Sequence, residues 1–313
     1  MTRTRLALVS AVALLAGLTA CTDTPRSRET SAAEATVTPE TPASPAAPET
    51  CDARASFRPT KGLTMPAGSH MRTIRERGRL ILGTTQDTLL FSSRDPFTGR
   101  IEGFDVDMGR EIARAIFGDP GKLEIRVVPR ATRVDAVKNG DVDLAISTMT
   151  TNCARWEQVD FSTVYFEAGQ RVLVGKDSAV TRIEDLGERP VCAATGSTSL
   201  DNIGKVSTGP VPVARADFGQ CLVAMQLGEV DAVSTDDTIL AGLAAQDPYA
   251  KVVGPRFTSE PYAIAVGKDH REFTEFVNAV LERLRADGTW KSIHDRWLKA
   301  SGPAPAPPAA KYR

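Results

Sequence analysis

The sequence lacks the features that mark membrane-spanning and nucleic-acid-binding chains. No run after residue 20 is apolar enough to cross a bilayer. Lysines and arginines (38) nearly balance aspartates and glutamates (39), and neither sign gathers into a block, so we expect no nucleic-acid partner. Aromatic residues are only 6% of the total, yet 42% of residues are hydrophobic, which is ample for a buried core. At roughly 100–200 residues per domain, the length predicts about two folded units.

Common catalytic motifs are also missing. The chain has no Gly-x-Ser-x-Gly elbow and no dinucleotide-binding fingerprint. Its three histidines, His70, His270 and His294, are too scattered to form a metal site, and we interpret them as surface residues. We therefore expect a protein that is not an enzyme and that needs neither a metal nor a cofactor.

The first residues form a targeting segment. Two early arginines precede a short apolar region, residues 6–15, and the run from Leu18 to Cys21 closes it. An apolar region this short is typical of a secretory signal and too short for a transmembrane helix. The ending resembles a bacterial lipobox, which predicts removal of residues 1–20 and acylation of Cys21. An ordinary signal peptide with an incidental cysteine is the alternative.

Two terminal stretches contain almost no large apolar side chains. Residues 22–50 are rich in Thr, Pro, Ala, Ser and Glu, and they cannot bury enough surface to offset the entropy of the chain. We interpret residues 21–50 as a lipidated cysteine followed by a flexible tether, which would hold an extracytoplasmic body near the cell membrane. Residues 303–313 have the same character, so we predict a disordered tail.

Four cysteines remain once Cys21 is assigned to lipid. An even number in an exported protein favours disulfides over metal binding or catalysis. Spacing alone leaves three pairings. Cys192 lies on a predicted strand and Cys221 on the helix that follows, so we pair these two, which leaves Cys51 with Cys153. A reduced pair is the remaining alternative.

Short apolar strands alternate with helices along the folded part. Residues 79–85 read as a buried strand, Asp105 is positioned to cap a helix with an apolar face, and residues 123–128 read as a second strand. This order predicts an α/β fold with a mainly parallel sheet.

An internal repeat predicts two similar lobes. Residues 136–145 are matched by residues 224–233, and each copy reads as a helix end, a glycine suited to a left-handed C-cap and a short strand. A polar cluster follows each copy, at 147–150 and 234–237. Since ligands of open α/β sheets bind beyond the carboxyl ends of the strands, both clusters should border a ligand crevice.

A second repeat predicts where the chain crosses between the lobes. Residues 172–177 resemble residues 264–269, and the two segments bracket the central part of the chain. We interpret them as two hinge strands. The predicted organisation is a first lobe over 51–174, a second lobe over 175–264, and a return to the first lobe with C-terminal helices over 265–302.

Four motifs together resemble the polar amino-acid group of bacterial solute-binding proteins. They are residues 103–107, 142–155, 160–162 and 230–236, and the similarity extends over about 79–298. That group serves uptake of glutamine, glutamate, aspartate and basic amino acids by ABC transporters. The resemblance implies a two-lobed periplasmic-binding-protein fold of type II, in which each lobe is a mainly parallel sheet flanked by helices.

The same resemblance assigns roles to individual residues. Arg155 matches the arginine that holds the ligand α-carboxylate through two parallel charge-assisted bonds. Thr148 and Thr150 match residues that add hydroxyl and main-chain donors. Asp236 matches the acid that receives the α-ammonium, and the neighbouring Asp237 is the competing candidate.

A loop of the second lobe and the pocket wall complete the predicted site. Ser197 and Thr198 match a loop at a helix start whose N–H groups are suited to an anion. Many members of the family carry an aromatic near residues 130 and 131, and some carry a lysine near residue 194. This sequence has Arg130, Ala131 and Ala194 at these positions. The remaining candidates for the pocket wall are Gln86, Phe91, Arg94, Arg130 and Arg133. A cationic wall would suit glutamate or aspartate, and Gln86 could serve an amide.

The predicted function is capture of glutamate, glutamine or aspartate by lobe closure. A monomeric, lipid-anchored protein would then deliver the amino acid to an ABC transporter permease. The alternatives are an amino-acid sensor that acts on a membrane receptor, an enzyme on the same fold, and a structural surface lipoprotein.

Overall fold

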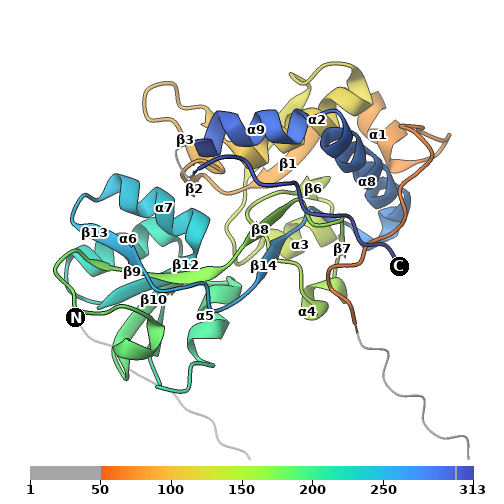
Figure 1. Ribbon diagram of the computed structural model, residues 1–313. Helices are drawn as coiled ribbons and strands as arrows, with labels where there is room; N and C mark the ends of the chain where they lie inside the picture. Colours follow the sequence, from red (N-terminus) through yellow and green to blue (C-terminus); the bar gives the residue numbers. More distant parts are fainter. Residues whose placement is uncertain (1–50, 300–301) are drawn as a thin grey trace, which may run out of the picture. The chain divides into compact units, whose positions relative to one another are not determined.

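The computed structural model describes residues 51–299 and 302–313. The predicted signal peptide, Cys21 and the tether lie outside the described residues. The described part belongs to one compact unit, and Figure 1 shows two sheets in it, each flanked by helices. No helix among the described residues is long and apolar enough to cross a membrane.

The first sheet is parallel on one side and antiparallel on the other. Its strands, in spatial order, are β5 (Leu123–Val127), β1 (Leu80–Thr84), β6 (Leu144–Ala145), β15 (Ala265–Val266) and β7 (Asp160–Phe161). β5, β1 and β6 run parallel, whereas β15 is antiparallel to both of its neighbours. The flanking helices are α1 (His70–Arg77), α2 (Phe104–Phe117), α3 (Arg133–Lys138), α8 (Arg271–Ala286) and α9 (Thr289–Leu298). We call this sheet and its helices the first lobe.

The second lobe repeats this plan. Its strands, in spatial order, are β11 (Val211–Arg215), β10 (Pro190–Ala194), β12 (Ala232–Asp236), β9 (Gln170–Gly175) and β13 (Ala250–Val253). The first three are parallel and β9 is antiparallel to its neighbours. The helices are α5 (Thr198–Ile203), α6 (Phe218–Gln226) and α7 (Asp237–Gln246), with the 3₁₀ turn η1 (Ile183–Leu186).

The predicted internal repeat is present as equivalent elements. It corresponds to α3 followed by β6 in the first lobe and to α6 followed by β12 in the second. Gly140 and Gly228 each follow the helix with a φ of 73°, the left-handed conformation that glycine adopts without strain. The predicted fold class, two mixed α/β lobes with parallel-cored sheets, is therefore confirmed.

The two strands that cross between the lobes are not the ones predicted. They are β8 (Phe166–Ala168) and β14 (Glu260–Tyr262), which pair antiparallel and lie between the two sheets in chain order. The repeated segment 172–177 begins within β9, and the segment 264–269 contains β15, so both include strands inside the two sheets. Their apolar similarity reflects burial in a sheet centre. The second sheet consequently begins before the boundary that we expected at residue 175.

The remaining elements are short. They are the small sheet β2 (Asp87–Thr88), β3 (Ser92–Arg94) and β4 (Ile101–Glu102), the short helix α4 (Cys153–Trp156) and the 3₁₀ turn η2 (Lys268–His270). α2 begins after Gly103, where a Cβ would lie 2.2 Å from the Phe91 carbonyl oxygen, so only glycine fits. The sequence predicts Asp105 as the N-cap of this helix. That prediction is wrong, because Gly103 is the N-cap and Asp105 lies inside the first turn.

The C-terminal residues are ordered against the first lobe, which corrects the predicted disordered tail. Tyr312 forms a β-bridge with Ser56, whose N–H donates to the Lys311 carbonyl over 3.0 Å. The Tyr312 hydroxyl donates to Glu282 on α8 over 2.5 Å. The prediction relied on the proline- and alanine-rich composition of this stretch. It did not take into account that the final Lys-Tyr-Arg can pack against the first lobe.

Both predicted disulfides are present. Cys192 on β10 is bonded to Cys221 on α6, with 5.5 Å between their Cα atoms. Cys51 is bonded to Cys153, the first residue of α4, with 6.0 Å between Cα atoms. The first bond links a strand to a helix within the second lobe. The other bond links residue 51 to the helix that carries Arg155.

Candidate functional site

Arg155 lies where the two lobes touch. Its N–H donates to the side chain of Asn152, the N-cap of α4. Its guanidinium donates to the Thr150 carbonyl over 2.5 Å and to the Gly196 carbonyl of the second lobe over 3.0 Å. No carboxylate among the described residues is bonded to it. Burial lowers the pKa of this guanidinium, and the nearby negative charge of Glu260 opposes that shift.

The second lobe approaches the first closely at Gly196. This glycine has a φ of 76°, and a Cβ there would lie 2.6 Å from the Cα of Ala131. Any side chain would therefore push the lobes apart. Gly196 also accepts a bond from Arg155, so this turn is a contact point between the lobes.

Asp236 presents a carboxylate oxygen that no described residue contacts by a hydrogen bond. It ends β12, is 3% exposed, and accepts a bond of 2.6 Å from the Tyr262 hydroxyl through Oδ2. Oδ1 is buried and has no partner among the described residues. Burial, reinforced by Glu260, raises the pKa of Asp236 to about 7.

The competing candidate, Asp237, is already neutralised. Its Oδ2 accepts from Arg256, 2.7 Å from Nε and 2.5 Å from Nη2. Asp237 thus forms an ion pair with a half-exposed arginine of the second lobe. The geometry favours Asp236 as the acid with an open binding position.

Arg133 is a buried cation to which no carboxylate of the described part of the chain is bonded. It is 3% exposed, and its Nη1 donates to the carbonyl and hydroxyl oxygens of Ser147 over 2.7 and 3.2 Å. Its Nε has no partner among the described residues. Burial lowers its pKa well below the usual value, Arg155 and Arg130 add to this, and Asp236 opposes it. A buried guanidinium in this state is suited to an anion that the protein itself does not supply.

Arg130, by contrast, is fully paired. Nη1 donates to both carboxylate oxygens of Asp87 over 2.9 and 2.7 Å, and Nη2 donates to the Thr88 hydroxyl. Its guanidinium also lies 4.8 Å from the ring centre of Phe218 in the second lobe. Arg130 therefore forms a contact between the lobes and has its charge balanced without a ligand.

Glu260 is a buried acid that the sequence analysis missed. It is 2% exposed on the crossing strand β14. Its Oε2 accepts from the Thr150 and Thr198 hydroxyls over 2.7 and 2.8 Å, and its Oε1 from Thr258 and Asn202 over 2.7 and 3.0 Å. Hydroxyls from both lobes thus converge on one carboxylate. Only a glutamate before a proline marks it in the sequence, and that pattern carries no specific signal.

Thr148 and Ser197 use their hydroxyls locally. The Thr148 hydroxyl donates to the Ser147 carbonyl, and its N–H donates to Asp105 over 2.7 Å. Its φ of 45° is strained for a β-branched residue, a feature concentrated at functional sites. Ser197 caps α5 by accepting from the Leu200 N–H, and its hydroxyl donates to the Ala194 carbonyl.

The other predicted wall residues have their groups engaged elsewhere. Gln86 is exposed and accepts from Arg94, which is also exposed. Phe91 is fully buried among aromatic rings, 5.2 Å from Phe166 and 6.1 Å from Tyr262 between ring centres. The structure therefore places Phe91 in the core of the first lobe, where it supports the tyrosine that binds Asp236.

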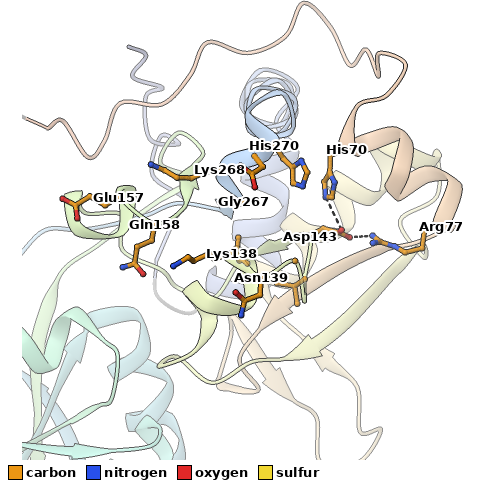
Figure 2. Close-up of a pocket in the computed structure, with 14 residues that line it drawn as sticks. His70, Arg77, Lys138, Asn139, Asp143, Glu157, Gln158, Gly267, Lys268 and His270 are labelled. Atoms are coloured by element: carbon orange, nitrogen blue, oxygen red, sulfur yellow. Dashed lines mark hydrogen bonds and ion pairs between the residues drawn. The ribbon is translucent and has the colours of Figure 1, made fainter.

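A separate cavity of about 530 Å³ lies on the first lobe and contains neither Arg155 nor Asp236. Figure 2 shows Asp143 in it, bonded to Arg77 and 3.3 Å from the His70 imidazole, which stacks on His270 at 3.7 Å. His294, expected at the surface, is buried on α9. Among the described residues no group of three or more His, Cys, Asp or Glu is arranged to hold a metal ion.

Comparisons with known proteins agree on one family. The model of the bacterial extracellular solute-binding proteins, family 3, matches residues 80–300. The chain is 37% identical over 230 residues to the ABC transporter glutamine-binding protein GlnH of Bacillus subtilis, covering 73% of this chain and 84% of that protein. It is 33% identical over 248 residues to the glutamate-binding protein GluB of Corynebacterium efficiens, covering 74% and 84%.

Solved structures show the same likeness. An ancestral arginine-binding protein bound to glutamine is similar with a TM-score of 0.67 and 35% identity, over 71% of this chain and 98% of that one. The cysteine-binding protein from Campylobacter jejuni is similar with a TM-score of 0.70 and 27% identity, over 74% and 94%. The fold is therefore shared with proteins whose bound amino acids differ.

Proposed function

Because the chain belongs to the bacterial extracellular solute-binding proteins of family 3, we propose that it captures an acidic amino acid, glutamate first, between its lobes. The family places it among the extracellular polar amino-acid-binding proteins of ABC transport, which are not enzymes. The relatives bind different amino acids, so the choice of ligand rests on the charges of this site.

One observation carries the proposal: three charged groups near one another, of which Arg133 and Asp236 are buried and Arg155 is half-buried, lack full partners among the described residues. Arg155 has no bonded carboxylate, and Oδ1 of Asp236 has no donor. An α-amino acid supplies a carboxylate for the first and an ammonium for the second. Both bonds are charge-assisted, and they are strong where water is excluded.

The third group, Arg133, favours a ligand with a second carboxylate. Its Nε is unpartnered among the described residues, and its charge is not balanced by a bonded acid. A glutamate side chain would supply that acid. Glutamine is the second candidate, since 37% identity links the chain to a glutamine-binding protein. Its amide would leave Arg133 buried without an anion, which is unfavourable.

Lobe closure follows from the placement of these groups. Arg155 and Arg133 belong to the first lobe and Asp236 to the second, so a ligand reaches all three only when the lobes meet. Arg155 already bonds to Gly196, and Glu260 joins hydroxyls of both lobes. The ligand then stabilises the closed state by contacts that an open state lacks.

Delivery and anchoring complete the proposal. The closed monomer would pass its amino acid to an ABC transporter permease, and lipid on Cys21 would hold it at the membrane. A sensor that acts on a membrane receptor would use the same site. Uptake of labelled glutamate in cells that lack the protein, measured separately from downstream signalling, distinguishes the two roles.

Thermal unfolding of the chain from Thr22 onward, with each of the twenty amino acids, tests the ligand. Ligand at about 100 times its Kd stabilises the folded state by about 2.7 kcal/mol, which raises the Tm. We expect the largest rise with glutamate, a smaller one with aspartate or glutamine, and none for Arg155→Ala. A chain whose Tm responds to no amino acid contradicts the proposed function.

A further inference from the structure

The helix that carries Arg155 is too short to hold itself in place. α4 has only four residues, and an isolated single turn of helix is unstable because its nucleation is costly. The Asn152 cap satisfies one N–H. The position of the backbone that carries the guanidinium must therefore depend on contacts that other segments make with α4.

The beginning of the folded body supplies the first set of these contacts. Cys51 is bonded to Cys153, the first residue of α4. The carbonyl of Ala53 accepts two bonds of 2.9 Å, one from the Thr151 hydroxyl and one from the Trp156 indole. Residues on both sides of Arg155 are thus tied to one short segment.

The end of the chain supplies the second set. The Arg313 guanidinium lies 3.8 Å from the ring centre of Trp156 and 5.2 Å from that of Phe57. The two rings meet edge to face at 5.9 Å. The last residue of the chain therefore packs on the residue that follows Arg155.

Both ends are fixed to the first lobe, so they form a rigid support. The Ser56 hydroxyl donates to the Phe161 carbonyl of β7 over 2.6 Å. Asn278 on α8 donates to the Ser56 hydroxyl and to the Phe57 carbonyl, each over 2.8 Å. Lys311 forms an ion pair with Asp52, which joins the two ends to each other.

We propose that residues 51–57 and 311–313 form a terminal clamp that positions Arg155 for the ligand carboxylate. The inference rests on the proposed function of Arg155 as the carboxylate-binding group. An ordered α4 has lost its conformational freedom before the ligand arrives, so binding does not have to order it. Breaking the clamp should weaken amino-acid binding without changing which amino acid is preferred.

The test compares the two disulfides, because only one of them touches α4. The chain from Thr22 onward is prepared as C51A/C153A, as Arg313→Ala and as the control C192A/C221A, whose bond lies within the second lobe. Glutamate affinity is measured by calorimetry at a temperature where all variants remain folded. We expect C51A/C153A to bind about tenfold more weakly and Arg313→Ala about threefold, with the control within about twofold of the parent.

Hydrogen exchange of residues 151–158 gives a second readout that does not depend on a ligand. We expect faster exchange there in C51A/C153A and Arg313→Ala, and no change in the control. Clamp variants that bind as tightly as the control overturn the inference and leave the proposed function intact. If Arg155→Ala binds as well as the parent, both fail. Should C51A/C153A not fold, Arg313→Ala decides the question alone.

Discussion

The two lobes share one sheet plan but carry opposite charges at the place where they meet. Arg133 and Arg155 of the first lobe have no bonded carboxylate among the described residues. The second lobe offers Asp236 with an open oxygen. A repeated fold thus provides two similar platforms, and the residues after each repeat give them different chemistry. Among the described residues, Arg133, Arg155 and Asp236 thus have no bonded counter-charge within their own lobes, which is the physical reason for the proposed bridging ligand.

The largest effect should come from removing the proposed carboxylate-binding group of the first lobe. Arg155→Ala is expected to weaken glutamate binding about a thousandfold, because truncating one partner of a buried charge pair costs about 2–5 kcal/mol. Calorimetric titration measures this. Arg155→Lys is the matched variant: it keeps the charge but loses the paired geometry, so its affinity should fall between the two. Equal affinities for the parent and Arg155→Ala would contradict the assignment.

In the second lobe, the charge of Asp236 should favour ligand binding but lower the stability of the ligand-free protein. Asp236→Asn removes the ammonium-binding charge, and we expect about a hundredfold weaker binding. The raised pKa of about 7 means that the ligand-free folded protein keeps a proton that the unfolded chain releases above about pH 4. The contribution of Asp236 to the free energy of unfolding therefore falls as the pH rises from about 4 to about 7.

The neutral asparagine removes this dependence. Ligand-free Asp236→Asn should consequently have a higher Tm than the parent at pH 8, while the two should differ little near pH 4. Thermal unfolding at both pH values measures this difference. A lower Tm for the variant at pH 8 would contradict this prediction. It would mean that the charged aspartate makes stabilising contacts that the structure does not contain.

The choice of ligand should depend on Arg133 and not on Arg130. We expect Arg133→Gln to lower the preference for glutamate over glutamine about tenfold or more. The reason is that the substitution removes the buried cation that would pair with the side-chain carboxylate of glutamate. Arg130→Gln is the comparison, since Arg130 is paired with Asp87 and should leave the preference nearly unchanged. Titration of each variant with both amino acids gives the ratio. A ratio unaffected by Arg133→Gln argues for an amide-selective site.

The smallest effect is the dependence of affinity on pH. Below about pH 7 Asp236 must lose a proton before it can bind an ammonium. Affinity should therefore weaken about tenfold between pH 8 and pH 6, a range in which the ligand's own ammonium and carboxylates keep their charges. Asp236→Asn should show a nearly flat profile. A parent profile that is equally flat would remove Asp236 from the site.

The fold was largely predictable because its signals are periodic. The repeated helix, glycine and strand, at 136–145 and 224–233, identified two similar lobes. The hinge could not be found in the same way, since the apolar repeats mark buried strands and the crossing strands carry acids such as Glu260. The C-terminal tail was misread because Tyr312 is ordered by Glu282 and Ser56, which are distant in sequence.

The sequence singles out Arg155 and Asp236 as the proposed charged pair, but it does not reveal their surroundings. Arg155 and Asp236 follow recognisable motifs at strand ends. Whether a neighbouring arginine is paired depends on tertiary contacts, and only the structure separates Arg130, bonded to Asp87, from Arg133, bonded to carbonyl and hydroxyl oxygens of Ser147. The sequence pattern contained no sign that Glu260 collects hydroxyls from both lobes.

A crystal structure of the protein with bound glutamate is the most direct test of the bridging ligand. The account predicts the α-carboxylate at hydrogen-bond distance from the Arg155 guanidinium and the ammonium at the same distance from Oδ1 of Asp236. A ligand that contacts only one of these two groups, or that binds in the cavity beside His70, would contradict it.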